Sequence, residues 1–263
     1  MQIRKMQTNE EREEDAMNAN ADATPYENLV APYPVWAALH ECGVERDSNW
    51  YHHVIGRGLF HDDFRTCIDL GTKELESYFK TMAALKTNNQ GKIPLAIEAR
   101  NSMAAFVQWT KDKIRCGKDP AMHQFENTGI SALLKRAKTH ERFIEDASSD
   151  DKPGGFTKDL KWDNWSPDFE NYLRITPGSS GVPLIYVIRE NDAPDPTPTG
   201  DFLEDYIMNA PLSGDNYKED RRTVHNMLKS LISDNPESEA LIKLMEREAN
   251  GRKDWKVLKL HYE

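Results

Sequence analysis

The apolar positions in the first half of the chain recur every three or four residues, the spacing of one face of an α-helix. One such helix is predicted after Thr72, a residue that can cap a helix over Glu74, with a stripe formed by Leu75, Phe79, Met82 and Leu85. A longer helix is predicted from Pro94 to Gly117, and a third from Thr128 to Ile144. A short apolar helix that Gly43 ends precedes them. These patterns indicate a helical N-terminal region over residues 25–147.

The second half opens on an aromatic segment, Lys161–Leu173, with the sequence KWDNWSPDFENYL. Ser166 can accept a hydrogen bond from an early helical N–H, and Pro167 suits the first helical position, where a missing N–H costs nothing. We therefore predict a helix that begins at Pro167 with Ser166 as its cap. The aromatic side chains lie at helical spacing and are predicted to seed a hydrophobic core.

The rest of the chain also favours helices, with one ambiguous segment. Pro183–Arg189 is short and β-branched like a strand, whereas its context and Pro183 favour a helix, and both interpretations stay open. Further helices are predicted at Phe202–Met208, from Ser213 to Leu231, after Pro236 and after Gly251. Because no long alternating pattern supports a sheet, the predicted fold class is all-α.

Composition divides this all-α chain into parts. Residues 1–24 are polar and almost free of large apolar side chains, which predicts a disordered tail. Residues 148–160 are rich in Asp, Pro and Gly, which predicts a linker. The expected organisation is two helical bundles, residues 25–147 and 161–263, joined by this Pro/Gly linker.

The charge of the chain argues against a dedicated nucleic-acid binder. The formal net charge is −10, from 34 Lys and Arg against 44 Asp and Glu, whereas affinity for nucleic acids rests on neutralising phosphates. Three widely spaced cysteines fit a reducing compartment. The chain has neither an apolar run of about 18 residues nor an N-terminal secretory h-region. We therefore expect a cytoplasmic protein with no membrane partner.

Candidate chemistry is sparse. The metal-like residues lack the paired spacing of zinc ligands; they are Cys42, His52, His53, His61 and Cys67. Acidic pairs such as Asp62-Asp63 and Asp150-Asp151 lie in polar segments, where nothing apolar shifts their pKa values. No P-loop, GxSxG, HExxH or GxGxxG motif occurs. We expect no enzymatic activity, no catalytic or metal residue, no cofactor and no small-molecule substrate.

Three other features could contact ligands. The turn Gly178–Gly181 has small residues suited to an anion-binding nest, although such a segment is more often only a turn. The isolated histidines His225 and His261 are interpreted as surface or half-buried residues. A basic strip supplies the candidates for RNA contact, Lys135, Arg136, Lys138 and Arg142. A charged helix face is usually only solvated, and the strip lacks aromatic residues for base stacking.

Four blocks of the second half follow one another in a distinctive order: WDNWSPDFENYL, GVPLIYVIRE, APLSGDNYKEDRRTVHNML and GRKDWKVLKLHYE. In this order they resemble the Gag-like N-terminal region of copia-type LTR retrotransposon polyproteins, abundant in diatoms and related algae. In the last block, Trp255, Leu258 and Tyr262 resemble the helix A-x-x-W-x-x-L-x-x-x-Y of that family. Arg100–Pro120 is similar to the region that precedes these blocks. Separately, Leu59–Leu85 loosely resembles a sterile-alpha-motif-like domain.

The resemblance implies a non-enzymatic structural protein. Its second bundle would be capsid-like and would self-associate into a particle around element RNA. It implies packing or assembly roles for Trp162, Trp165, Phe169, Tyr172, Trp255, Leu258 and Tyr262. The family carries a CCHC zinc knuckle downstream of this region, and here the helical pattern runs to the last residue, so we expect the second bundle to be truncated. The alternative is a host helical adaptor, of element-derived or independent origin, that mediates protein–protein interaction.

Overall fold

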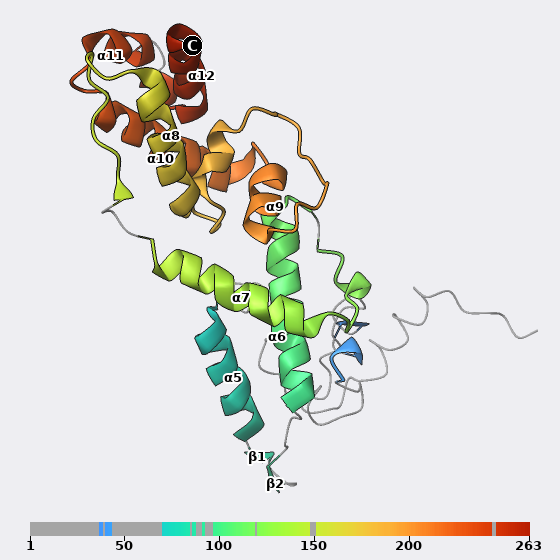
Figure 1. The fold of residues 1–263 in the computed structure, drawn as a ribbon. Helices are drawn as coiled ribbons and strands as arrows, with labels where there is room; N and C mark the ends of the chain where they lie inside the picture. The colour runs from blue at the N-terminus through green and yellow to red at the C-terminus, as the bar shows by residue number, and fades with distance from the viewer. Residues whose placement is uncertain are drawn as a thin grey trace, which may run out of the picture. The chain divides into compact units, whose positions relative to one another are not determined.

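The structure is a computed structural model that describes residues 37–38, 40–43, 70–84, 86–87, 91–92, 97–118, 120–147, 151–243 and 246–263. Within these residues it is a helical protein (Figure 1). The α-helices are α5 Thr72–Ala84, α6 Ile97–Arg115, α7 Ile130–Glu145, α8 Trp162–Ile175, α9 Phe202–Asn209, α10 Gly214–Leu231, α11 Pro236–Lys243 and α12 Gly251–Tyr262. The predicted all-α class is confirmed for the part of the chain that the structure describes.

Short elements complete this framework. The described residues include the 3₁₀-helices η1 Met122–Gln124, η3 Leu184–Ile188 and η4 Glu246–Glu248. The two-residue segments β1 Lys86–Thr87 and β2 Gly91–Lys92 form a minimal antiparallel ladder in which Lys86 faces Lys92. A ladder of this length builds no sheet. None of the described helices combines the length and apolarity that crossing a bilayer requires.

The chain forms two compact units. The first unit comprises Met1–Thr110 and Ala121–Leu134, and the second comprises Lys111–Pro120 and Lys135–Glu263. The division therefore passes through α6 and α7. The domain boundary predicted at residues 148–160 stays a prediction. Within that range, Phe156 is buried and its N–H donates to the carbonyl of Leu231 at 2.7 Å.

The first unit has a small aromatic core in its described part. Phe106 of α6 lies 5.0 Å from Phe125, and Trp109 meets Phe125 edge-on at 5.8 Å, measured between ring centroids. Ser102 donates a hydrogen bond from its hydroxyl to the side-chain oxygen of Asn127 at 2.8 Å. The tail predicted to be disordered, residues 1–24, and Pro94 lie outside the described residues. Of the short helix predicted before Gly43, residues 37–38 and 40–41 are described and are helical.

The second unit has a hydrophobic core of its own. It draws buried side chains from α8 to α12 and from η3, with Phe156 beside them. In α12, Gly251 lies against α10: a Cβ at this position would stand 2.6 Å from the backbone nitrogen of His225. Because no real Cβ approaches so closely, a glycine is needed for these helices to pack at this distance.

Two predicted helix starts are wrong. Helix α8 begins at Trp162, with Lys161 as its cap, so that Ser166 and Pro167 lie inside the helix. Burial of Trp162 and Trp165 in the core favours the earlier start, and Pro167 is tolerated on the exposed face, where water can satisfy the carbonyl that loses its partner. In α5, Thr72 is the first helical residue, and Glu74 accepts a hydrogen bond from Gly71 N–H at 3.1 Å.

The ambiguous segment Pro183–Arg189 contains the 3₁₀-helix η3, which Pro183 and Arg189 flank as caps. All five residues of η3 are buried. A short continuous apolar run suits either a buried strand or a buried helix, so the pattern alone could not separate them. The remaining starts agree closely with the sequence: Asp201 caps α9, and Asn250 caps α12 through a hydrogen bond from Lys253 N–H at 3.3 Å.

Candidate functional site

The predicted packing or assembly residues meet in the core of the second unit. They come from two helices far apart in sequence, α8 and α12. Trp162 lies 5.0 Å from Trp255 and stacks on Tyr262 at 5.6 Å, and Phe169 lies 5.4 Å from Trp255. Six of the seven are buried and Tyr262 is half-buried; the buried ones are Trp162, Trp165, Phe169, Tyr172, Trp255 and Leu258. They fill the core. Whether any serves assembly stays a prediction.

The basic strip on α7 is only partly free for a ligand. Lys135, Lys138 and Arg142 are exposed. Arg136 is half-buried, forms an ion pair with Asp112 at 2.6 Å and lies over the ring of Phe202. The same carboxylate also accepts a hydrogen bond from Tyr206. An RNA phosphate could therefore be met by three exposed cations on this face.

The turn Gly178–Gly181 already holds a carboxylate of the protein itself. Asp220 of α10 is 2 % exposed and accepts hydrogen bonds from Ser179 N at 2.7 Å, Ser179 Oγ at 2.6 Å and Tyr186 Oη at 2.9 Å. A Cβ at Gly178 would stand 2.5 Å from Asp220 Oδ2. The anion of this turn is thus Asp220, and burial together with this carboxylate raises the pKa of Tyr186.

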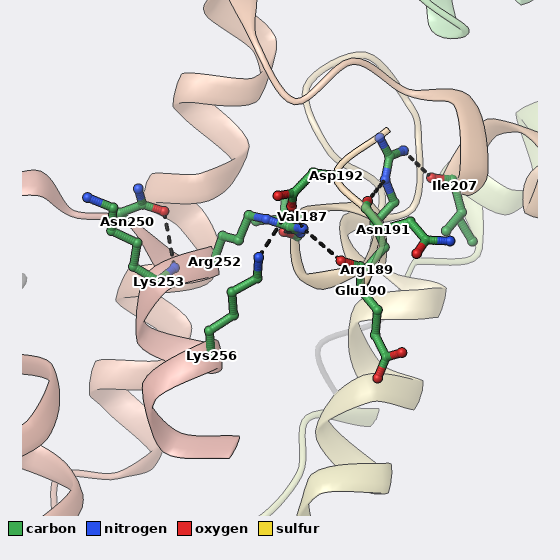
Figure 2. Close-up of polar contacts among 10 residues, drawn as sticks. All are labelled: Val187, Arg189, Glu190, Asn191, Asp192, Ile207, Asn250, Arg252, Lys253 and Lys256. Carbon is green, nitrogen blue, oxygen red and sulfur yellow. Dashed lines mark hydrogen bonds and ion pairs between the residues drawn. The ribbon is translucent and has the colours of Figure 1, made fainter. Parts of the chain in front are cut away.

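Two buried arginines were not singled out by the sequence. Arg189 directly follows η3 and Arg252 is the second residue of α12; their exposed fractions are 8 % and 7 %. Figure 2 shows Arg252 beside Asp192 and the carbonyl of Val187. Its guanidinium donates to Val187 O at 2.8 Å and to Asp192 Oδ1 at 2.5 Å. Arg252 therefore ties α12 to η3 and the segment after it.

Arg189 ties the same segment to α9. Its Nε donates to Asn191 O at 2.9 Å and its Nη1 to Ile207 O at 2.8 Å (Figure 2). The pKa of Arg189 is lowered by burial and then by the nearby Arg252. Backbone carbonyls accept from Nε and Nη1 of Arg189, whose Nη2 is buried without a hydrogen-bond partner, and from Nη1 of Arg252. Both arginines therefore donate to backbone carbonyls around η3 and α9. The contacts of Arg252 with Val187 and Asp192 join residues 65 and 60 positions apart, and nothing in the sequence pattern pairs such residues.

A buried histidine–carboxylate pair links α10 and α12. His225 Nδ1 lies 2.6 Å from Asp254 Oδ2, and the side chains are 4 % and 0 % exposed. The interpretation of His225 as a surface or half-buried residue is therefore wrong, because the approach of α12 at Gly251 covers it. Burial raises the pKa of Asp254, and the hydrogen bond from His225 opposes that rise. His261 is exposed and contacts Glu237 at 2.9 Å.

His225 of this pair lines a pocket. The pocket has a volume of about 180 Å³ and is lined by residues of α10 and α11, namely His225, Lys229, Glu239, Ile242 and Lys243. Asp254 Oδ1, behind His225, is buried without a hydrogen-bond partner. The arrangement combines one imidazole, two ammonium groups and a carboxylate around a small apolar wall.

No metal centre is apparent in the described part of the chain. None of its His, Cys, Asp and Glu residues gather in a group of three or more that could hold an ion. Of the metal-like residues, Cys42 is buried, and burial raises the pKa of its thiol. The other four, His52, His53, His61 and Cys67, lie outside the described residues.

Comparisons with known proteins add no assignment. No protein-family model matches the chain, and searches of curated proteins and of solved structures find no match either.

Proposed function

We propose that this chain is a non-enzymatic structural protein of the retrotransposon Gag type, which self-associates into a capsid-like particle around element RNA in the cytoplasm. In this proposal the chain consists of two helical bundles joined by residues 148–160, the second of them capsid-like. The proposal rests first on the ordered sequence blocks of the second half and their resemblance to copia-type Gag regions.

One structural observation carries the proposal further. The blocks are spread over residues 162–263, yet α8, η3, α10 and α12 pack on one another around a common aromatic core. The blocks occur in the same order as in the Gag-like region, and they also pack on one another as one unit. Together, these two facts support a fold shared with that region better than scattered sequence similarities would. Because a fold does not by itself determine a function, the proposed self-association needs a direct test.

Self-association also needs an apolar surface that a second copy can bury. Leu260 on α12 is 86 % exposed, the highest value among the large apolar side chains that are exposed in the described residues. Full burial of such a side chain contributes about 1.5–3 kcal/mol. A contact of that size is weak alone, but repetition around a shell multiplies it. We infer that Leu260 lies at a contact between copies.

Size-exclusion chromatography and negative-stain microscopy of the purified chain, at several salt concentrations, test this proposal. We expect oligomers whose abundance rises with protein concentration, and particles in the micrographs. Leu260→Lys should shift the protein toward monomer because a charge replaces the apolar contact. The matched control is Asn171→Lys, which adds the same charge at an exposed position of α8 and should leave assembly unchanged. A wild-type chain that stays monomeric at high concentration would contradict the proposal.

The second candidate function is a host helical adaptor that binds a protein partner through the first unit. The observation that favours it is Ile97, which is 62 % exposed at the start of α6 and could be covered by a partner. The genomic setting separates the two candidates. Many near-identical copies flanked by terminal repeats support the element, whereas one intact single-copy locus supports the adaptor.

A further inference from the structure

Positive side chains gather where the segment after η3 meets α12. Arg189 and Arg252 are both buried, and Arg252 donates to Asp192 Oδ1 at 2.5 Å. Lys256, one turn further along α12, lies 3.3 Å from the same oxygen (Figure 2). One carboxylate oxygen therefore accepts from both a guanidinium and an ammonium group.

Tyr217 of α10 shows that a third arginine belongs to this cluster. The guanidinium of Arg221 lies 5.9 Å from the centroid of the Tyr217 ring. Burial raises the pKa of Tyr217, and the positive charges of Arg252 and Arg221 oppose that rise. The charges of Asp192 and Arg189 also act on this pKa. Three arginines and one aspartate are thus close enough to this hydroxyl to act on it.

The cluster holds more positive than negative charge. A single carboxylate, that of Asp192, faces four cations: Arg189, Arg252, Arg221 and Lys256. Nη2 of Arg189 is buried without a hydrogen-bond partner, and Arg252 lowers the pKa of Arg189 after burial has done so. Among the described residues, Arg221 forms no ion pair. The like charges therefore repel one another and favour a further anion.

The other carboxylates nearby have cations of their own. Glu190 pairs with Lys259 at 2.8 Å, and Glu248 pairs with Lys253 at 2.6 Å. Glu248 also feels the charge of Arg221, although its ion pair is with Lys253. These carboxylates leave the excess positive charge around Asp192 in place.

Asp192 occupies the position that a ligand could take. Its side chain is 77 % exposed, so the place of its carboxylate on Arg252 opens to solvent. Asp192 belongs to no helix or strand, and its side chain can turn away without breaking one. A phosphate group carries up to two negative charges and three acceptor oxygens, and guanidiniums match its geometry. It suits this excess of cations better than one carboxylate does.

We propose that a phosphate group displaces the carboxylate of Asp192 and binds to Arg252 and Lys256, with Arg221 and the hydroxyl of Tyr217 as further donors. Arg189 contributes its charge. Because arginine and lysine are already protonated at neutral pH, binding requires no proton uptake by these cations. The site goes beyond the proposed self-association and does not depend on it.

Isothermal titration calorimetry of the full chain at about pH 7.5 tests the ligand class, with sodium chloride keeping the ionic strength constant. Inorganic phosphate and methyl phosphate represent the free and the esterified group, and binding of either supports the proposal. Acetate represents a single carboxylate and should bind more weakly than both. The proposal is wrong if neither phosphate compound binds, or if acetate binds as tightly as they do.

Removing the internal carboxylate tests the displacement. Asp192→Asn should tighten phosphate binding about tenfold, the effect of one charge-assisted hydrogen bond that no longer competes. The matched control is Asp168→Asn, which makes the same charge change at an exposed position of α8 and should bind like the wild type. Equal affinities of these two variants would overturn the displacement of Asp192.

A pair of neighbouring arginines separates the cluster from general surface charge. Arg221→Gln should weaken phosphate binding about tenfold, because one charged donor is lost. The matched control is Arg222→Gln, the next residue of α10, which is exposed and should bind like the wild type. Circular dichroism verifies that both variants are folded. Equal loss of affinity in the two would mean that net charge and not this cluster holds the anion.

Discussion

At the scale of single residues, His140 is held neutral inside the second unit. It is 4 % exposed, and its Nε2 lies 2.7 Å from the carbonyl of Gly181, to which Nε2–H donates. Burial first, and then the positive charge of Arg115, lower the pKa of His140 from 6.5 to about 4. The unfolded chain therefore binds a proton near pH 6.5 that the folded chain binds only near pH 4.

This difference predicts a loss of stability in acid. Because the unfolded state binds more protons in this window, the free energy of unfolding falls as the pH drops from 6.5 toward 4. The loss attributable to His140 is about 3 kcal/mol at its largest. Urea unfolding across this pH range measures it. His140→Gln keeps an N–H donor but cannot titrate, so its curve should fall less steeply, and parallel curves for the two proteins would exclude the effect.

The sequence predicts which residues are buried better than it predicts which residues contact one another. The aromatic side chains of α8 were expected in a core from their spacing, and the structure buries them. The pairs His225–Asp254 and Arg252–Val187 join positions 29 and 65 residues apart. No local pattern connects such positions, because each contact exists only after α12 has packed. The sequence therefore could not predict the pocket at His225, and it indicated a surface or half-buried residue at this position.

At the scale of elements, the contact between α10 and α12 depends on one missing side chain. A Cβ on Gly251 would stand 2.6 Å from His225 N and from Val224 Cγ1. Val224 is fully buried, so neither neighbour can move without disturbing the core. Gly251→Ala should therefore destabilise the protein by about 1–3 kcal/mol, the usual range for an overpacked site.

Denaturant unfolding followed by circular dichroism measures this loss. The matched control is Gly154→Ala, where nothing lies within 4 Å of the added Cβ and the hydrogen bond from Trp165 to the backbone carbonyl is kept. The control should unfold like the wild type. Equal stability of Gly251→Ala and Gly154→Ala would mean that the two helices can separate at little cost.

The helix starts show where local sequence signals are sufficient to predict the structure. Asp201 and Asn250 each cap the helix that follows through a side-chain hydrogen bond, and both starts were predicted closely. At α8 the local signal of Ser166 and Pro167 conflicts with the burial of Trp162, which is 4 % exposed. The free energy gained by burying a tryptophan is larger than the cost of one lost backbone hydrogen bond on an exposed face. Tertiary packing therefore determines where α8 begins.

At the scale of the whole molecule, composition predicts linkers and contacts define units. Proline and glycine predict a linker at residues 148–160, which stays a prediction, and the contacts group residues 111–120 and 135–147 with the second unit. Ion pairing of Arg136 with Asp112 joins two of these stretches within that unit. A linker-like composition describes the local chain, but a unit is defined by contacts between segments far apart in sequence.

The distribution of charge governs whether the protein can hold RNA. The net charge of −10 repels phosphates at long range, so binding must depend on a local group of cations. On α7 that group is Lys135, Lys138 and Arg142, since Arg136 is neutralised by Asp112. We expect binding of single-stranded RNA only at low salt. For about three phosphate contacts, the logarithm of affinity should fall with a slope of about −2 against the logarithm of salt concentration.

Filter binding over a salt series tests this with two triple variants of equal charge. Changing Lys135, Lys138 and Arg142 to Gln should abolish the low-salt binding and its slope, because the phosphate contacts are gone. The control changes Lys158, Lys161 and Arg222, also two lysines and one arginine at exposed positions. It should weaken binding only slightly. If the two variants lose the same affinity, net charge and not the α7 strip holds the RNA. Wild-type binding that is negligible at the lowest salt would mean that the α7 strip does not bind RNA.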